Sequence, residues 1–217
     1  MRTESLRKHI FIFLILFWVS ISGQAIAETY RISKSNTRVS FSVKHFRVFQ
    51  VDGCFSDVSG SVDIAQFQLL SLKGGISTDS VETGLWIRDN NLKSELYFNS
   101  KQFPLIAFSS EVVKYRENNQ FEIQGTMTIK GKRRPILFSG SSWKSADEGE
   151  VVLLLKAVGT INRQDFGIGP REYVGEEGLV VGNKVRFEIF AEICLQPEGS
   201  SAKCKALHSD QFETCSH

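Results

Sequence analysis

The sequence predicts an all-β protein in which one antiparallel sheet curls into an eight-stranded barrel. Apolar and polar residues alternate over residues 121–130 and, apart from Phe190, over residues 185–193. Such alternation buries one face of a strand and exposes the other, as in an antiparallel sheet. Several predicted strands reach about ten residues, against the usual five to six. Long antiparallel strands curl readily, and about eight of them can close into a barrel with room for one ligand. A two-sheet sandwich is the alternative.

The other elements follow from the same patterns. Further strands are predicted at residues 38–44, 54–64, 69–79, 105–116, 134–143 and 150–162. The last of these is apolar on both faces, so we expect another part of the chain to cover its outside. Asn118-Asn119 and Gly131-Lys132 are predicted to be turns between strands. One helical segment is predicted near residues 85–96, where it would plug or cap one end of the barrel.

The first 27 residues have the three regions of an export signal. Arg2, Arg7 and Lys8 form a basic start, residues 10–21 are apolar apart from Ser20, and residues 25–27 read Ala-Ile-Ala. Because a spanning helix needs about 20 apolar residues, this run favours a signal peptide cleaved after Ala27. The mature protein is then predicted to be periplasmic. The alternative is an uncleaved membrane anchor.

Cleavage would leave a neutral chain. The segment removes three of the 26 basic and one of the 24 acidic residues, which leaves 23 of each. A neutral domain lacks the electrostatic footprint that nucleic acid requires, so no nucleic-acid partner is expected. No later stretch is apolar enough to span a membrane. The remaining length suits one domain with a real core, and its oligomeric state is left open.

The predicted barrel interior is rich in phenylalanine. Gly125 and Gly140 fall on the same inward phase, so large rings alternate with gaps. One interpretation is an apolar tunnel that admits a long chain. The alternative is a core filled by its own rings, which would make the protein a non-catalytic structural or interaction barrel.

An ordered set of motifs resembles one family. These motifs are Tyr30-x-Ile32, Val39-x-Phe41-x-Val43-x-His45, Gly53-x-Phe55, Ser80-Val81-x-Thr83-Gly84, Arg88-Asp89-x-x-Leu92-Lys93-Ser94, Phe103-Pro104-x-x-x-Phe108-x-Ser110, Gly125-x-x-Thr128-x-x-Gly131, Arg134-Pro135-x-x-Phe138, Ile161-Asn162-Arg163-x-Asp165-Phe166-Gly167 and Val181-Gly182-x-x-Val185-x-Phe187. The chain resembles YceI-like proteins over residues 29–195. The resemblance implies a periplasmic lipocalin-like barrel that holds a polyisoprenoid, a quinone-like lipid or a similar amphiphile, without catalysis and without another cofactor. We therefore divide the chain into a signal peptide (1–27), a barrel domain (28–196) and a cysteine-containing tail (197–217). Asn91, where the family often has His, and Gln164 depart from the pattern.

Candidate ligand-binding residues come from the inward phase of the strands, from the helix and from the loop after residue 162. They are Phe41, Val43, His45, Trp86, Arg88, Leu92, Phe98, Phe108, Met127, Phe138, Arg163 and Phe166. Arg163 would offer its donors to a headgroup at the rim, or alternatively close a loop through a salt bridge. The helix around Arg88 would line the tunnel mouth, or alternatively only plug the barrel. His45 is predicted to point inward, more as a structural group than as a base, because no nucleophile or paired carboxylate accompanies it.

Four cysteines lie in the mature chain: Cys54, Cys194, Cys204 and Cys215. An even number in an oxidising compartment predicts two disulfides with three possible connectivities. Cys194 is expected to face outward, where it could pin the tail against the barrel and cover the strand at 150–162. A metal site built from the tail cysteines with His208 and His217 is the alternative; its spacing fits no established pattern, so no metal is predicted.

Overall fold

The computed structural model describes residues 26–45, 49–147, 150–170 and 181–195. Within these ranges the chain forms eleven strands in one antiparallel sheet. The strands are β1 (Glu28–Ser33), β2 (Thr37–His45), β3 (Phe49–Phe55), β4 (Val58–Ala65), β5 (Gln68–Ser77), β6 (Val81–Glu82), β7 (Leu105–Tyr115), β8 (Gln120–Ile129), β9 (Lys132–Asp147), β10 (Glu150–Asn162) and β11 (Val181–Cys194). The helix α2 spans Trp86–Lys93, and short 3-10 turns occupy η1 (Thr78–Ser80), η2 (Glu117–Asn119) and η3 (Arg163–Phe166).

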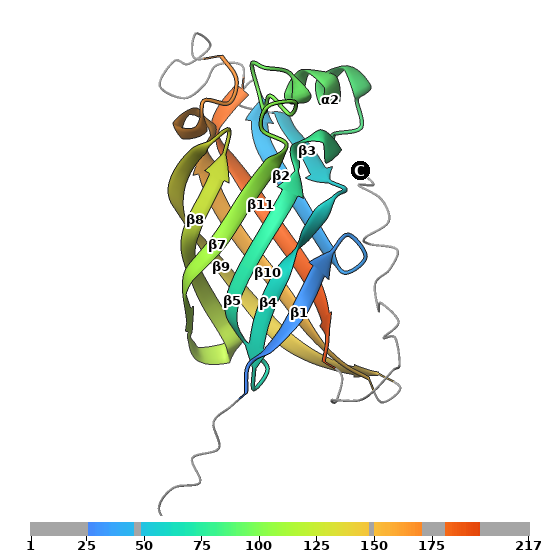
Figure 1. Ribbon diagram of the computed structural model, residues 1–217, viewed down its shortest axis with the longest axis vertical. Helices are drawn as coiled ribbons and strands as arrows, with labels where there is room; N and C mark the ends of the chain where they lie inside the picture. The colour runs from blue at the N-terminus through green and yellow to red at the C-terminus, as the bar shows by residue number, and fades with distance from the viewer. Residues whose placement is uncertain (1–25, 46–48, 148–149, 171–180, 196–217) are drawn as a thin grey trace, which may run out of the picture.

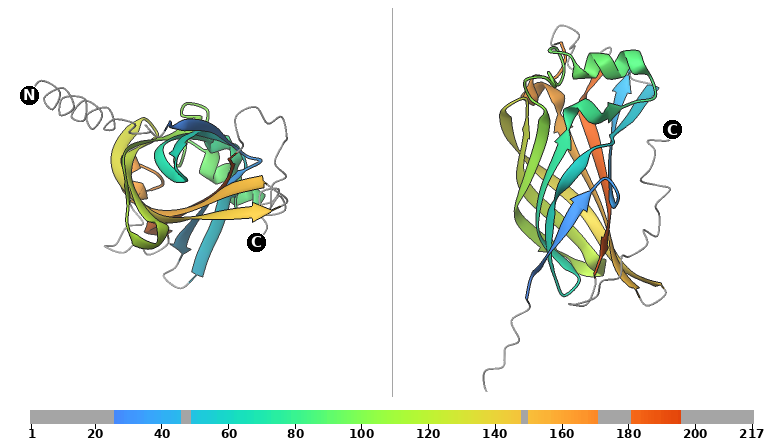
Figure 2. Two further views of the ribbon diagram at one scale, coloured as in Figure 1. Left: turned by 90° about the horizontal axis from the view of Figure 1, so that it is seen from below. Right: turned by 45° about the vertical axis from the view of Figure 1, so that its right-hand side comes forward.

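The eleven described strands amount to eight antiparallel segments, because three segments are bent in the middle. The first couple, β1 and β2, pairs with the second couple: β1 pairs with β4, and β2 pairs with β3. The second couple pairs in the same way with the third: β4 pairs with β5, and β3 pairs with β6. Each couple β1–β2, β3–β4 and β5–β6 is therefore one long strand interrupted at a corner. β11 pairs with β2, so the eight segments form a ring (Figure 2). The predicted eight-stranded barrel is confirmed. The structure has eleven strands in its described residues because three of the eight segments are interrupted at a corner.

Local hydrogen bonds stabilise the corners. Between β1 and β2, the Asn36 side chain accepts from the Ser33 backbone N–H at 2.9 Å and donates to the Arg31 carbonyl oxygen at 2.9 Å. Between the second and third bent segments, the Ser56 N–H donates to the Ser80 carbonyl oxygen at 3.1 Å. These bonds satisfy backbone groups that leave the sheet ladder where the strand turns.

The two ends of the barrel differ. At the end of the β7–β8 turn, the rings of Tyr115 and Phe121 pack with centroids 5.6 Å apart, and the Tyr115 hydroxyl accepts from the Leu69 N–H at 2.8 Å. Lys144 lies over the Phe67 ring, 4.1 Å from its centroid. We call this the closed end. At the opposite end lies α2 (Figure 1), and we call this end the mouth.

A lysine fastens the loops at the mouth. Lys130, in the turn between β8 and β9, donates to the carbonyl oxygens of Glu95 at 3.0 Å and Gly167 at 3.1 Å. Burial lowers the pKa of this ammonium group, with a further contribution from nearby Lys132. The segment after α2 and the loop after η3 are thereby held to one turn of the barrel.

The element predictions differ from the structure at their boundaries. The helix ends at Lys93 rather than residue 96, since Ser94 leaves the helical conformation and its N–H closes back to the Asn91 carbonyl oxygen. The predicted turn at Gly131-Lys132 lies one residue earlier, where Lys130 and Gly131 adopt positive φ angles of 49° and 70°. No helix in the described ranges has the length and apolar character needed to cross a bilayer.

The barrel interior fits rings against glycines on neighbouring strands. Phe41 is opposite Gly53, Phe121 is opposite Gly140, and Phe138 is opposite Gly159. A Cβ atom added at Gly140 would lie 2.6 Å from the Phe121 ring and 2.3 Å from the Lys156 carbonyl oxygen. The gap expected at Gly140 is therefore occupied by the ring opposite it. The gap at Gly125 is occupied by the Phe108 ring, which lies diagonally across the β7–β8 pair.

Candidate functional site

A cavity of about 500 Å³ opens at the mouth of the barrel. Its walls come from β2, β3, the start of β11 and α2 with the residues on either side of it. Six of the predicted ligand-binding residues meet here: Phe41, Val43, His45, Trp86, Arg88 and Leu92. We call this space the mouth cavity.

Two elements supply these six side chains. Phe41, Val43 and His45 alternate along β2, so a single strand directs all three to the inner face. From α2, Leu92 packs against the barrel core, whereas Trp86 at the start of the helix is 73% exposed. The cavity thus has an apolar floor and an open apolar edge.

Arg88 is oriented by Thr83, the first residue of the loop between β6 and α2. Its Nε donates to the Thr83 hydroxyl oxygen at 2.7 Å, and its Nη2 donates to the Thr83 carbonyl oxygen at 2.6 Å. The buried Thr83 hydroxyl in turn donates to the Asp89 carboxylate. The helix has no side-chain cap at Leu85, so this network fixes its first turn while Arg88 still borders the cavity.

A second, smaller space lies deeper in the barrel. This inner cavity measures about 50 Å³ and is almost wholly apolar. Its lining includes three predicted residues, Phe108, Met127 and Phe138. Phe41 borders the mouth cavity and Phe187 borders the inner one, and their ring centroids are 6.5 Å apart. This ring contact lies between the two cavities.

Three predicted residues line neither cavity. Phe98 is buried in the core with its ring 5.9 Å from that of Phe55, and Phe166 is likewise a core residue. Arg163 is 3% exposed, and its guanidinium donates to the carbonyl oxygens of Ile168 at 2.6 Å, Val181 at 3.1 Å and Gly182 at 3.1 Å. Burial lowers the pKa of this group. These contacts favour loop closure by Arg163, made through carbonyl oxygens instead of the expected salt bridge.

Several lining residues were not predicted. Leu85, Ile87, Tyr97, Val51 and Val181 also border the mouth cavity, as does Asn91, noted above as a departure from the family pattern. The sequence did contain a signal for Leu85 and Ile87, because they are the apolar neighbours of Trp86 at the start of the helix. Val51 required the register, because it is opposite Val43 across the β2–β3 pair.

The described cysteines lie on β3 and β11. Cys54 is buried and Cys194 is half-buried, and neither is a free cysteine. Cys204 and Cys215 lie outside the described residues, and so do residues 1–25 of the predicted signal peptide. The predicted disulfide pairing and the metal alternative therefore stay predictions. Within the described ranges, no group of three or more His, Cys, Asp or Glu residues is placed to hold a metal ion.

An eight-segment antiparallel barrel with a cavity at one end has the architecture of lipocalin-like barrels. The chain belongs to the YceI-like family: the model of the YceI-like domain matches residues 30–193. The resemblance noted in the sequence is thereby confirmed.

Related sequences support this family, and solved structures support the fold. The UPF0312 proteins SAS2572 and SA2479 of Staphylococcus aureus are 31% and 32% identical over 167 residues, which is 74% of this chain and 94% of each relative. The fold is similar to that of BcnA from Burkholderia cenocepacia, with a TM-score of 0.64, 19% identity and coverage of 74% of this chain and 96% of that one. The YceI protein of Campylobacter jejuni gives a TM-score of 0.62, 23% identity and coverages of 71% and 90%. A polyisoprenoid-binding domain from Saccharophagus degradans gives 0.58, 11% identity and coverages of 79% and 100%.

Proposed function

We propose that this protein binds an isoprenoid-like or other long-chain amphiphile in the mouth cavity and carries or stores it in the bacterial periplasm. The observation that carries the proposal is the mouth cavity, whose volume of about 500 Å³ falls within the usual range for small-molecule sites, about 300–1,000 Å³. A solved neighbour with the same fold is a polyisoprenoid-binding domain, which supports this class of ligand.

The cavity suits an amphiphile because its lining is mainly apolar with a few polar groups. Val43, Trp86 and Leu92 offer apolar contact, whereas His45 and Arg88 offer hydrogen-bonding groups at the same opening. An apolar chain would gain free energy by leaving water, about 0.8 kcal/mol for each buried CH₂ group. The polar groups would fix the orientation of the headgroup. No catalytic role is proposed, because the sequence offers no activated nucleophile or acid–base pair.

Lipid extraction tests the binding proposal. Protein purified natively from the periplasm is extracted with organic solvent, and the extract is analysed by mass spectrometry. We expect one class of apolar molecule to co-purify. In Trp86→Ala the amount per protein should fall about fivefold or more, since truncating an aromatic anchor costs about 1 kcal/mol or more. The matched control is Leu137→Ala, which removes another exposed apolar side chain that borders neither cavity.

A second function is favoured by a different observation. The inner cavity is only about 50 Å³, and rings fill the space beside the inward glycines. These features support a structural or interaction barrel with a self-filled core. That function predicts no co-purified lipid and no rise in melting temperature when polyprenols are added. Both results together would refute the carrier proposal.

The export part of the proposal has its own measurement. Export would place the mature chain in an oxidising compartment, and cleavage after Ala27 would make Glu28 its first residue. The intact mass of protein from a periplasmic extract should correspond to residues 28–217. A full-length mass in the membrane fraction would instead identify an uncleaved anchor.

A further inference from the structure

Part of the outer wall of the barrel is buried. On β10, Val152 and Leu154 alternate with the inward-facing core residue Leu153, yet they are only 3% and 4% exposed. Glu192 on β11 is also on the outward phase and is 4% exposed. The outward Cys54 on β3 is 3% exposed. Something other than the barrel interior therefore shields this wall, which is formed by β10, β11, β2 and β3.

The described residues supply only part of the cover. Trp143 is opposite Leu154 on β9, and its ring lies 6.2 Å from that of Phe190 on β11. Phe190 is opposite Lys156 on β10, so the two rings approach each other across β10 beside Leu154, and Trp143 remains 39% exposed. The α-helix of the described chain lies at the mouth and not on this wall (Figure 1). A second layer over Val152 and Cys54 must come from elsewhere.

The strand register excludes a bond between the two barrel cysteines. Cys54 is opposite Ser40 on β2, and Ser40 is opposite Glu188 on β11. Cys194 lies six residues further along β11, a distance of about 20 Å at 3.3–3.4 Å per residue. A disulfide requires Cα atoms within about 7 Å of each other. Since neither cysteine is free, each needs a different partner.

The tail begins beside this wall and is long enough to cross it. The Leu195 N–H donates to the Val151 carbonyl oxygen at 2.8 Å, so Leu195 is still hydrogen-bonded to the first residues of β10. Cys204 and Cys215 follow Cys194 by 10 and 21 residues. Ten extended residues span about 33 Å, which exceeds the roughly 20 Å between the barrel cysteines.

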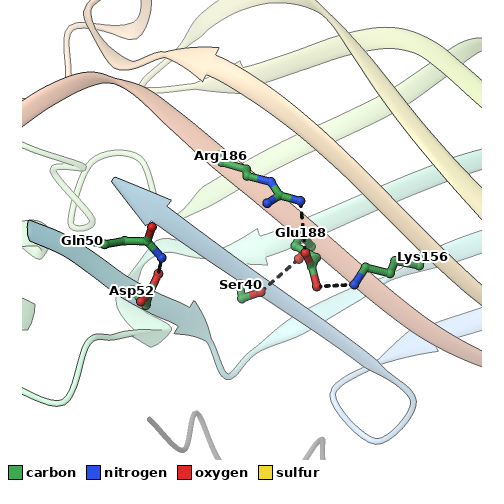
Figure 3. Close-up of polar contacts among 6 residues, drawn as sticks. All are labelled: Ser40, Gln50, Asp52, Lys156, Arg186 and Glu188. Carbon is green, nitrogen blue, oxygen red and sulfur yellow. Dashed lines mark hydrogen bonds and ion pairs between the residues drawn. The ribbon is translucent and has the colours of Figure 1, made fainter. Parts of the chain in front are cut away.

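The wall also has a polar hollow next to Cys54. Its volume is about 330 Å³, and its lining includes Arg38, Asp52, Arg186 and Glu188. Glu188 pairs with Lys156 at 2.9 Å and with Arg186 at 3.5 Å, and Gln50 donates to Asp52 at 2.7 Å (Figure 3). The hollow therefore presents charges of both signs.

The tail has a composition to match that hollow. Lys203 and Lys205 flank Cys204, whereas Asp210 and Glu213 precede Cys215. A segment with both signs of charge can pair with a wall that has both, and the apolar stripe at Val152 and Leu154 can accept its apolar residues. The same chain therefore suits both parts of the wall.

We propose that residues 196–217 lie along the outer wall of β10, β11, β2 and β3, held by one disulfide from Cys194 and one from Cys54 to the two tail cysteines. Two of the three possible connectivities remain, Cys54–Cys204 with Cys194–Cys215 and Cys54–Cys215 with Cys194–Cys204. The tail is then a second layer that shields the doubly apolar strand β10. The inference rests on the proposed export only through the oxidised state of the cysteines, and it is independent of the ligand.

Disulfide mapping tests the connectivity. Full-length protein, expressed with its export segment and purified from the periplasm with free thiols blocked, is digested without reduction and analysed by mass spectrometry. We expect peptides that join each barrel cysteine to a tail cysteine within one molecule. A Cys54–Cys194 or Cys204–Cys215 peptide would overturn the proposal. So would four blocked thiols or bonds between two molecules, and neither result would bear on lipid binding.

A paired substitution tests the covering. In Cys204→Ser/Cys215→Ser the tail loses its two attachments, and we expect the melting temperature to fall by roughly 10 °C or more. Binding of a fluorescent apolar dye should rise severalfold as Val152 and Leu154 become accessible. The matched control is Ser200→Ala/Ser201→Ala, which changes the same tail without touching a cysteine. An unchanged melting temperature and unchanged dye binding in the cysteine variant would refute a docked tail.

Discussion

Inside the barrel, phenylalanine rings pack against glycines on neighbouring strands. The phase of the strands predicts that Gly140 faces inward, and the structure confirms it. The phase could not predict that Phe121, nineteen residues earlier in the chain, would occupy the space that Gly140 leaves. A ring over an inward glycine protects a strand position that has no side chain of its own to pack.

We predict that Gly140→Ala destabilises the barrel. The new methyl group would lie 2.3 Å from the Lys156 carbonyl oxygen, so backbone as well as the Phe121 ring must move. Overpacking of this kind costs about 1–3 kcal/mol, measurable by urea unfolding. Gly74→Ala is the control, because its nearest neighbour would be the Ser59 carbonyl oxygen at 3.8 Å. Equal unfolding midpoints for the two variants would contradict the prediction.

Polar contacts between strands tie the first segment of the barrel to its neighbours. Asp63 on β4 accepts from the Thr29 hydroxyl on β1 at 2.6 Å and from the Ser71 hydroxyl on β5 at 2.5 Å. These bonds, that from Ser71 first, lower the pKa of the Asp63 carboxyl group. The sequence predicted the strands that carry Asp63 and Ser71, but it predicted no strand at Thr29 and could not predict the register that brings the two hydroxyl groups to one carboxylate.

We predict that this contact makes stability depend on pH in acid. The folded-state pKa of Asp63 is below its unfolded value, about 3.9, so the stabilisation is present above that value and is lost as pH falls through the folded-state pKa. Because the group is exposed, the effect at neutral pH should be below about 1 kcal/mol. Melting temperatures measured from pH 7 to pH 3 should fall less steeply for Asp63→Asn than for the natural protein.

A second variant checks the cause of this dependence. Thr29→Ala/Ser71→Ala keeps the carboxylate but removes its two hydrogen-bond donors. Its melting temperature should therefore fall between pH 7 and pH 3 about as steeply as that of Asp63→Asn. If its melting temperature instead falls as steeply as that of the natural protein, other groups cause the pH dependence.

The mouth cavity and the inner cavity lie on either side of a contact between two rings. They are separated where Phe41 and Phe187 meet. The length of ligand that the protein accepts should therefore depend on whether the Phe41 ring is in place. No pattern in the sequence reports this, because the two rings lie on different strands and are 146 residues apart.

We predict that Phe41→Leu lengthens the preferred ligand. A homologous series of polyprenols is added to each protein, and the rise in melting temperature is recorded, since a ligand that binds the native state stabilises it. The length that gives the largest rise should increase in Phe41→Leu, because the two cavities join. Phe121→Leu, which shortens a buried ring at the closed end, should lose stability without changing the preferred length.

The sequence by itself determined the local properties of this protein. Alternation with a period of two predicted the buried face of several strands and favoured a barrel. The segment 150–162, which is apolar on both faces, predicted that its outside is buried as well. The position of α2 and six of the mouth-cavity residues also followed from local pattern and family motifs.

Only the tertiary structure decided which distant residues meet. It placed the cavity at the mouth, filled the inward gaps with rings, used Arg163 to close a loop and separated Cys54 from Cys194 by six residues along the sheet. Each of these depends on strand register and on pairs far apart in the chain. A periodic pattern specifies the face of a residue but not its partner, because shifting a strand by two residues preserves every face and changes every contact.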